Sequence, residues 1–346
     1  MLVRQAKEAA RQWVLEEGRS LPHFYGAFFA GSTNWMPEDT PLPAASDVDV
    51  KIVLESPEIP GDFRKFRYSD VVLEIAYAPV APFQSPDAIL GDYYTAGHFT
   101  RPNIILDPAG QLTRIQAAVA QDFAKRRWVS RRCEHARAWF LTSLQWLHPA
   151  APLPDQVFAW VYPTSVLAHL VQVAALQNPT VRKCFVASSQ ALAQYGHASL
   201  HEAMLGLLGS ADLSLTQVQA LHRSCLEVFD VAKAIITTAF FGSGNISELG
   251  RPIADEGIRE IIESGYHREA VFWILVTHTW CQKALDNDAS VAVKDTFTPR
   301  YQHLLAELGV TSAADLQAGI ERITALLPRV GEVCDAMMSA NPAIVD

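Results

Sequence analysis

Several signatures of common enzyme and metal-binding classes are absent from this sequence. The five cysteines are scattered and never spaced as C-x-x-C, which argues against a disulfide framework and against a structural zinc site. Neither the G-x-x-x-x-G-K-[ST] phosphate loop nor the G-x-S-x-G nucleophile elbow occurs, so P-loop and hydrolase-elbow chemistry have no support. His197 and His201 lack the glutamate of H-E-x-x-H, and we expect them on an exposed helix face rather than at a zinc ion.

Basic tracts and long apolar runs are missing as well. The chain carries 28 Lys and Arg against 37 Asp and Glu, a formal net charge of -9. This balance argues against nucleic acid as a partner and suits a cationic small molecule better. No apolar run approaches the roughly 20 residues that span a bilayer. The most apolar segment, Val166 to Leu176, contains a His and a Gln and is expected to be a buried helix. Together with the charged N-terminal segment, these features predict a cytoplasmic protein without a membrane partner.

The 346 residues, of which 49% are hydrophobic, are enough for about two domains. Strand signals dominate before Gly110 and nearly vanish after it, where helical periodicity takes over. We therefore predict an α+β fold. Its N-terminal domain, residues 1–115, would contain a mixed sheet with helices, and residues 116–346 would form an all-α helical bundle.

Individual elements follow from periodicity and from end signals. Strands are predicted at 24–30, 47–54, 71–77 and 103–108, and the run KFRYSDVVLEIAYAP, residues 65–79, which includes 71–77, is expected to form one or two strands. Helices are predicted at 2–17, 86–96, 111–126, 129–147, 154–177, 180–194, 214–240, 256–263, 267–286, 299–308 and 312–337. Ser214 and Gln217 form a capping-box pattern, Thr298 before Pro299 indicates a helix start, and Pro163 is expected to kink or break its helix.

One stretch, FFAGSTNWMPEDTPLPAASDVDVKIVLE from Phe28 to Glu55, places charge inside a strand. Successive side chains of a strand point to opposite faces, so Asp47, Asp49 and Lys51 share one face. Carboxylates in an otherwise apolar strand cost free energy unless they are solvated or paired. Either this is a solvated strand end, or a cation belongs between the aspartates. By its position, Lys51 would pair with them or touch a phosphate.

Two further features complement the aspartates. Glu74 is a single acid in the apolar run VVLEIAY, so three carboxylates would converge if its strand neighbours that of Asp49. Magnesium prefers such oxygen ligands. Gly31 lets the backbone approach a ligand closely, and Ser32 and Thr33 supply hydroxyl donors for phosphate oxygens. Phosphate on one side and metal on the other is the layout that nucleotidyl transfer requires.

Gly31-Ser32, Asp47-Val48-Asp49 and Glu74 together resemble the signature of the nucleotidyltransferase superfamily that includes DNA polymerase beta and the bacterial aminoglycoside nucleotidyltransferases. The resemblance covers about residues 20 to 110. In this chain fourteen residues separate Ser32 from Asp47 and include three prolines. We expect an irregular loop there, which could serve as a lid or as a wall of the substrate site.

The resemblance implies a fold, a reaction and roles for these residues. Asp47 and Asp49 would bind Mg²⁺, the Gly31-Ser32-Thr33 turn would grip a nucleoside triphosphate, and Glu74 would be a metal ligand or the general base. The implied reaction transfers AMP from ATP, or another nucleoside monophosphate, to a hydroxyl of a small molecule such as an aminoglycoside-like antibiotic. The alternatives are a degenerate nucleotide-binding or regulatory module, and a transferase that acts on protein or RNA. The oligomeric state stays open, with a homodimer as one option.

Three other patterns have a structural and a functional interpretation, and the structural one is favoured in each case. The five arginines between Arg126 and Arg137 are expected on a solvated helix face rather than at a triphosphate. The GSGN motif at residues 242–245 follows a predicted helix, so it indicates a helix-ending loop. Acids at 255, 256, 260 and 263 lie near a helix start, where the helix dipole favours them, although they could also form a patch for a cationic acceptor.

Overall fold

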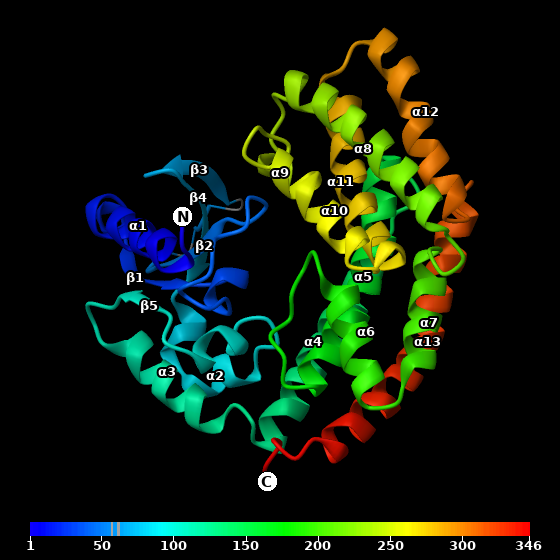
Figure 1. The fold of residues 1–346 in the computed structure, drawn as a ribbon. Helices are drawn as coiled ribbons and strands as arrows, with labels where there is room; N and C mark the ends of the chain where they lie inside the picture. The colour runs from blue at the N-terminus through cyan, green and yellow to red at the C-terminus, as the bar shows by residue number, and fades with distance from the viewer. Residues whose placement is uncertain (57, 61–62) are drawn as a thin grey trace. The chain divides into compact units, whose positions relative to one another are not determined.

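The computed structural model describes residues 1–56, 58–60 and 63–346. The chain divides into two compact units, both drawn in Figure 1. The sheet unit comprises Met1–Arg132, Phe240–Ile253 and Asp346, and the helical unit comprises Cys133–Ala239 and Ala254–Val345. The α+β fold class is therefore confirmed. The sheet unit extends past the predicted boundary at residue 115 because helix α3 (Gln111–Asp122) inserts apolar side chains into its core.

Within the described residues, five strands form one mixed sheet in the order β3-β4-β2-β1-β5. Strands β2 and β4 are parallel, and the other neighbouring pairs are antiparallel. The strands are β1 (Phe24–Phe29), β2 (Val48–Leu54), β3 (Arg64–Tyr68), β4 (Val71–Pro79) and β5 (Ile104–Leu106). The predicted strands at 24–30, 47–54, 71–77 and 103–108 are confirmed, with ends shifted by a few residues.

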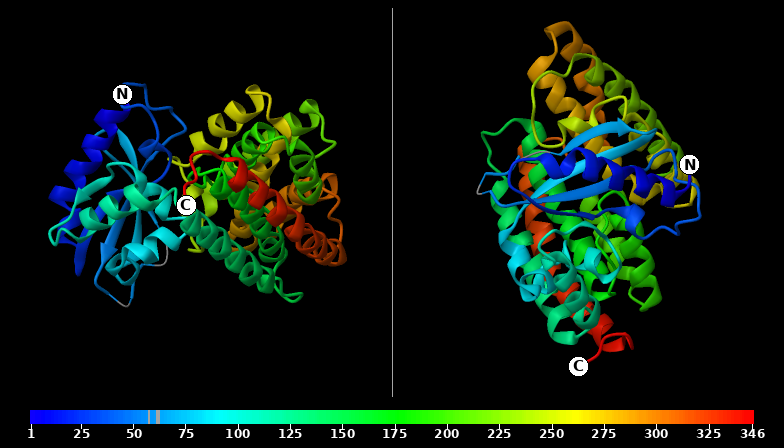
Figure 2. Two further views of the ribbon diagram at one scale, coloured as in Figure 1. Left: turned by 90° about the horizontal axis from the view of Figure 1, so that it is seen from below. Right: turned by 90° about the vertical axis from the view of Figure 1, so that its left-hand side faces the viewer.

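The first helix, α1 (Val3–Glu16), covers one face of this sheet, as the right-hand view of Figure 2 shows. Alternate residues of β2, namely Val48, Val50 and Ile52, face a core that includes Trp13 of α1. The opposite face holds a second apolar core around Phe28 and Val53, to which α2 (Pro86–Gly91), α3 and the 3-10 turns η3 (Ala81–Gln84) and η4 (Ala96–Thr100) contribute. Along this second face, β2 changes from charged residues at its start to apolar Val53 near its end.

The other short 3-10 turns of the sheet unit are η1 (Gly18–Ser20), η2 (Ser32–Asn34) and η6 (Ser243–Asn245). Helix α4 (Arg126–Ser143) and the short helix α9 (Arg251–Ala254) carry the chain from one unit to the other. The remaining elements belong to the helical unit: η5 (Leu144–Trp146), α5 (Leu153–Ala174), α6 (Cys184–Gln194), α7 (Ala198–Leu208), α8 (Leu215–Ile235), α10 (Glu256–Glu263), α11 (His267–Asp288), α12 (Val291–Glu307) and α13 (Ala313–Ala340).

Helix α11 is central to the helical unit, where it packs on α5, α8, α10 and α12. Helix α5, which packs on α6 and α13, is long and apolar enough to cross a membrane by length and composition. However, 89% of its apolar window is buried within the protein. The prediction of a buried helix around Val166 is therefore confirmed, and core packing accounts for its composition.

Of the predictions made from proline and capping residues, some are confirmed and others are wrong. The capping box of Ser214 and Gln217 is present at the start of α8. Of the two outcomes predicted at Pro163, the break is wrong, because α5 runs through this proline, and the kink stays a prediction. The hydroxyls of Thr164 and Ser165 donate to nearby helix carbonyls. The predicted helix start at Pro299 is also wrong, because α12 begins at Val291 and includes this proline. Helix α7 lies outside the predicted helix ranges, although its residue His201 was expected on a helix face.

Candidate functional site

Backbone pairing brings the predicted acids together on one face of the sheet. Asp49 of β2 is the register partner of Glu74 in the parallel strand β4. Because aligned residues of neighbouring strands point to the same face, their carboxylates are side by side. Asp47 lies one residue before β2. Because it is two positions before Asp49, its side chain points to the same face of the sheet. We call Asp47, Asp49 and Glu74 the carboxylate row.

A tight turn adds a lysine to this row. Ser69 and Asp70 connect β3 to β4, and both have positive φ angles, 45° and 64°. Positive φ at both central positions defines the type I′ turn, whose twist suits a two-residue hairpin. This turn pairs Tyr68 with Val71 and, three steps along, Lys65 with Glu74. The local turn therefore determines which β3 residue faces the acids.

Lys65 forms ion pairs with two members of the carboxylate row. Its Nζ lies 2.7 Å from Asp47 Oδ2 and 3.1 Å from Glu74 Oε2, and its side chain is only 2% exposed. Burial acts to lower the pKa of this lysine, but the attraction of Asp47 and Glu74 outweighs it, so the pKa is raised. The ammonium is therefore held in its charged form between the two carboxylates.

Asp49 is the member of the row without such a partner. Its carboxylate makes no hydrogen bond and no ion pair with any residue that the structure describes. Burial raises its pKa well above the usual value, and the negative charges of Asp47 and Glu74 raise it further. Burial also raises the pKa of Glu74, against the opposing effect of Lys65. The raised pKa values show that the protein's own cations compensate the ionised form of the row incompletely.

The backbone at Gly31 lies close to the carboxylate of Asp49. The amide of Ala30 donates to the backbone carbonyl of Asp49 at 3.0 Å, which places the end of β1 against the start of β2. Gly31 follows with φ 63° and ψ -168°, a backbone region that only glycine occupies readily. A Cβ at this position would overlap the Asp49 carboxylate. Glycine at this position therefore allows the backbone to approach the Asp49 carboxylate closely, while its contact with a ligand stays a prediction.

The remaining residues of the predicted phosphate turn differ in exposure. Ser32 is exposed, whereas Thr33 is buried and its hydroxyl has no hydrogen-bond partner among the described residues. The turn η2 begins at Ser32, and the first N–H groups of such a turn have no partner within it. Ser32 can therefore meet a ligand directly, and the orphan hydroxyl of Thr33 remains available inside.

Lys51 lies on the same face as Asp49, two residues farther along β2. Burial lowers its pKa, while the carboxylates of Asp49, Glu74 and Asp92 act in the opposite direction. His98 is buried nearby, and burial together with the charge of Lys51 lowers its pKa to about 4. The imidazole is therefore neutral at pH 7, and Lys51 is the second positive charge of the site.

A divalent cation fits this site by the chemistry of Asp47 and Asp49. Among the described residues, no group of three or more His, Cys, Asp or Glu side chains is arranged to hold a metal ion, and Lys65 already pairs with Asp47 and Glu74. Magnesium, however, often uses only one or two carboxylates and takes its other ligands from substrate phosphates and water. The unpaired carboxylate of Asp49 is the group that such a cation would compensate.

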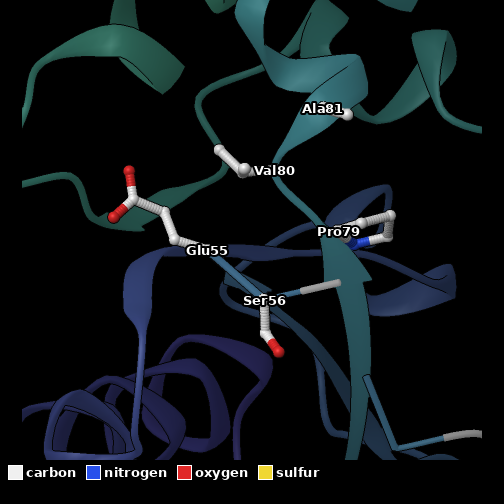
Figure 3. Close-up of a pocket in the computed structure, with 5 residues that line it drawn as sticks. All are labelled: Glu55, Ser56, Pro79, Val80 and Ala81. Atoms are coloured by element: carbon white, nitrogen blue, oxygen red, sulfur yellow. The ribbon is translucent and has the colours of Figure 1, made fainter. Parts of the chain in front are cut away.

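A separate shallow pocket lies at the other end of the same strands. Figure 3 shows it between the residues that follow β2 and the end of β4, lined by Glu55, Ser56, Pro79, Val80 and Ala81. The carboxylate row begins just before β2, so β2 separates the two regions along its length. Among the described residues of this lining, Glu55 is the single acid, and no cationic side chain accompanies it. We assign no chemistry to this pocket.

The other patterns weighed in the sequence have mostly structural roles. Arg132 is a correction to the predicted solvated arginine face: it is buried and donates to the carbonyls of Leu90 and Phe123. His201 is also a correction, because it is buried and its Nε2 lies 2.8 Å from Glu269 Oε1. Among the acids near α10, Glu260 pairs with Lys183 at 2.8 Å, as a structural role would require.

Sequence reasoning missed two polar residues at the site, Lys65 and Asn245. The GSGN segment does follow a helix, but it belongs to the sheet unit, and Asn245 Oδ1 accepts a hydrogen bond from Lys65 Nζ at 3.3 Å. Lys65 could have been found from the Ser69-Asp70 turn and strand register. Asn245 could not, since 180 residues separate it from Lys65 and no local signal links them.

Comparison with known proteins adds no family assignment. A scan against protein-family models found no match to this chain. A search of curated proteins likewise found none.

Proposed function

We propose that this protein is a magnesium-dependent nucleotidyltransferase that transfers a nucleoside monophosphate, with AMP from ATP as the first case, to a hydroxyl of a small molecule. The observation that carries the proposal is the placement of Asp49. Its unpaired, partly buried carboxylate lies in register with Glu74 and against Gly31. A protein retains such an uncompensated charge at a cost in stability, and a cation-bound ligand would offset that cost.

Metal binding and triphosphate binding are assigned to different residues of the site. Asp47 and Asp49 would hold Mg²⁺, which supplies charge neutralisation and orientation of the phosphates when bound. Gly31, Ser32 and Thr33 would contact the triphosphate from the turn after β1, and Lys51 would add a positive charge. These assignments use the side chains that the sheet gathers on one face.

Glu74 is the residue proposed to accept the proton of the acceptor hydroxyl. Its raised pKa brings it closer to neutral pH, where a general base works best. The acceptor oxygen would form its bond to the α-phosphorus while the bond from that phosphorus to the pyrophosphate oxygen breaks. The hydroxyl proton would pass to Glu74, and pyrophosphate would leave. A cationic acceptor such as an aminoglycoside suits the net charge of -9.

The ion pairs of Lys65 favour one alternative, a nucleotide-binding module without turnover. An ammonium already lies between Asp47 and Glu74, in the place where a catalytic site would need accessible carboxylates. In such a module ATP would bind near Gly31 and the acceptor hydroxyl would have no free base. The two functions therefore differ in turnover and agree in nucleotide binding.

The test is transfer of label from [α-³²P]ATP in the presence of Mg²⁺, with a panel of aminoglycosides and, separately, with whole-cell lysate. We expect a labelled small molecule from the wild type and a loss of about 10³-fold in Asp49→Asn, since metal-dependent charge stabilisation supplies several kcal/mol. Glu55→Gln is the matched control, because it changes an acid at the other end of β2 and should keep wild-type activity.

The other outcomes are equally informative. Label on protein or RNA would identify a macromolecular acceptor and contradict the small-molecule one. Asp49-dependent ATP binding without transfer would establish the binding module instead. If neither ATP nor Mg²⁺ binds in an Asp49-dependent way, the proposed function is wrong.

A further inference from the structure

Lys65 is a charged residue of the sheet unit with a nearly buried side chain, and the proposed mechanism does not use it. Its side chain is 2% exposed, while the side chains of its partners Asp47 and Glu74 are 16% and 23% exposed. Its third partner is the side-chain oxygen of Asn245. An ammonium has three N–H donors, and these three contacts account for all of them.

The opposite face of β3 holds Lys65 in this position. Phe66 and Tyr68 point to the side of α1, where the ring of Phe66 packs on Trp13 with centroids 5.3 Å apart. The Tyr68 hydroxyl donates to Glu16 of α1 at 2.6 Å. Because neighbouring residues of a strand alternate in direction, anchoring these two side chains directs Lys65 to the carboxylate row.

The segment that supplies Asn245 is built around its own close contacts. The hydroxyl of Ser247 donates to the carbonyl of Gly244 at 3.0 Å. A Cβ at Gly250 would overlap the backbone carbonyl of Asn245, and one at Gly244 would lie 3.2 Å from the ring of Phe63. Glycine at these two positions therefore allows the segment to close on itself and to reach the residues next to Lys65.

The positive charge of Lys65 affects how strongly the carboxylate row can bind another cation. Opposite charges at hydrogen-bond distance attract each other, so the two ion pairs of Lys65 compensate part of the negative charge of the row. A divalent cation bound at Oδ2 of Asp47 would compete with Lys65 for that oxygen, and its charge would repel the ammonium. The two cations cannot both keep their full set of contacts.

We propose that Lys65 is the resident counter-cation of the carboxylate row, which stabilises the row without metal and which an incoming divalent cation must displace from Asp47. This inference rests on the proposed function, because it assigns the cation to Asp47 and Asp49. Lys65 is thereby a positioning residue that sets the affinity for metal. Asn245 takes part by holding the ammonium in its metal-free position.

The experiment measures Mn²⁺ binding without nucleotide, by electron paramagnetic resonance and calorimetry, together with thermal unfolding with and without Mn²⁺. For Lys65→Met we expect at least about tenfold tighter Mn²⁺ binding, since this corresponds to only about 1.4 kcal/mol. Its melting temperature without metal should be lower than that of the wild type, and Mn²⁺ should raise it by more. A merely structural lysine would not increase metal affinity when removed.

Arg67→Met is the matched control. Arg67 lies two residues along the same strand and on the same face, but it is exposed and forms a hydrogen bond to the turn carbonyl of Asp70. We expect it to leave Mn²⁺ affinity unchanged. If Lys65→Met does not fold, Asn245→Ala tests the same idea with the lysine present, and about two- to threefold tighter Mn²⁺ binding is expected.

The outcomes separate this inference from the proposed function. Wild-type Mn²⁺ binding that depends on Asp49, with no increase in Lys65→Met or in Asn245→Ala, overturns the inference alone. Weaker binding in Lys65→Met also overturns it, because the lysine would then assist the metal. Absence of Asp49-dependent Mn²⁺ binding from every variant overturns both.

Discussion

The two units treat buried polar groups in different ways. In the sheet unit, carboxylates and lysines are gathered on one face of the sheet, and the carboxylate of Asp49 has no partner among the residues described. In the helical unit, His201 and Glu269 are paired one to one at 2.8 Å. His278 is buried beside the ring of Tyr301, and burial lowers the pKa of its imidazole to about 3.

The difference concerns charge that is left uncompensated. In the helical unit, Glu269 is paired with His201 and the His278 imidazole is neutral at pH 7, so neither site holds an unpaired buried charge. The grouped carboxylates of the sheet unit repel one another instead, and Lys65 offsets this only in part. Perturbed titratable groups that cluster in this way are typical of functional sites. The comparison therefore points to the sheet unit as the place of chemistry.

The largest effect on stability is expected at Gly31, in the sheet unit. Gly31→Ala should lower the free energy of unfolding by about 2–6 kcal/mol, because strain at this φ and ψ costs about 1–3 kcal/mol and crowding of a packed site about as much again. Gly110→Ala is the control, since it also has positive φ, 68°, but has open space around it. There we expect about 1–2 kcal/mol. Urea unfolding of both variants gives the difference, and equal losses would show that Gly31 serves only the turn.

The buried pair of the helical unit should behave as a structural contact. Glu269→Leu leaves buried His201 without its acceptor, so we expect a loss of about 1–3 kcal/mol in the free energy of unfolding. Glu202→Leu removes the more exposed partner of Arg268 and should cost no more than about 1 kcal/mol. Thermal unfolding with Mn²⁺ titration checks both. A change in Mn²⁺ affinity in Glu269→Leu would contradict the division of roles.

The smallest expected effect is on the pH dependence of stability. Because the pKa of His278 is about 3 in the folded protein and about 6.5 when unfolded, its contribution is fully present above pH 6.5. It is lost as the pH falls, by up to about 1.4 kcal/mol per pH unit. His278→Leu should reduce the slope of unfolding free energy between pH 6 and 4 by this amount.

The exposed His303 provides the control for this measurement, and His303→Leu should keep the wild-type slope. Urea unfolding at several pH values gives the slopes. An unchanged slope in His278→Leu would mean that this imidazole reaches solvent or a partner when protonated.

Much of the fold could be predicted because the signals are local. Alternating apolar residues identified β2 and β4, and helical periodicity identified most of the helical unit. Predictions failed where the surroundings of a residue, either packing or access to water, outweighed a local rule. At Pro299 the Thr-Pro pattern indicated a start, yet α12 continues through it. The carbonyl that this proline leaves without a donor belongs to exposed Asp295, where water can bond to it.

Within the candidate site the limit of prediction has the same origin. Strand alternation correctly places Asp47, Asp49 and Lys51 on one face, because it depends only on backbone geometry. It does not say which cation approaches the acids. The sequence pointed to Lys51, whereas the ion pairs come from Lys65 through the register of a hairpin. For His201 the polar character suggested exposure, and only the position of Glu269 on another helix explains its burial.

The sequence by itself therefore determined the α+β class and the common face of Asp47 and Asp49. It also determined that a glycine follows strand β1. Each of these features depends only on neighbours along the chain. The tertiary structure decided that Glu74 lies in register with Asp49, that Gly31 touches its carboxylate, and that Lys65 and Asn245 meet beside the row. These contacts join segments that are distant in the chain. They form only when strand register and loop closure fix both ends, which local preferences do not encode.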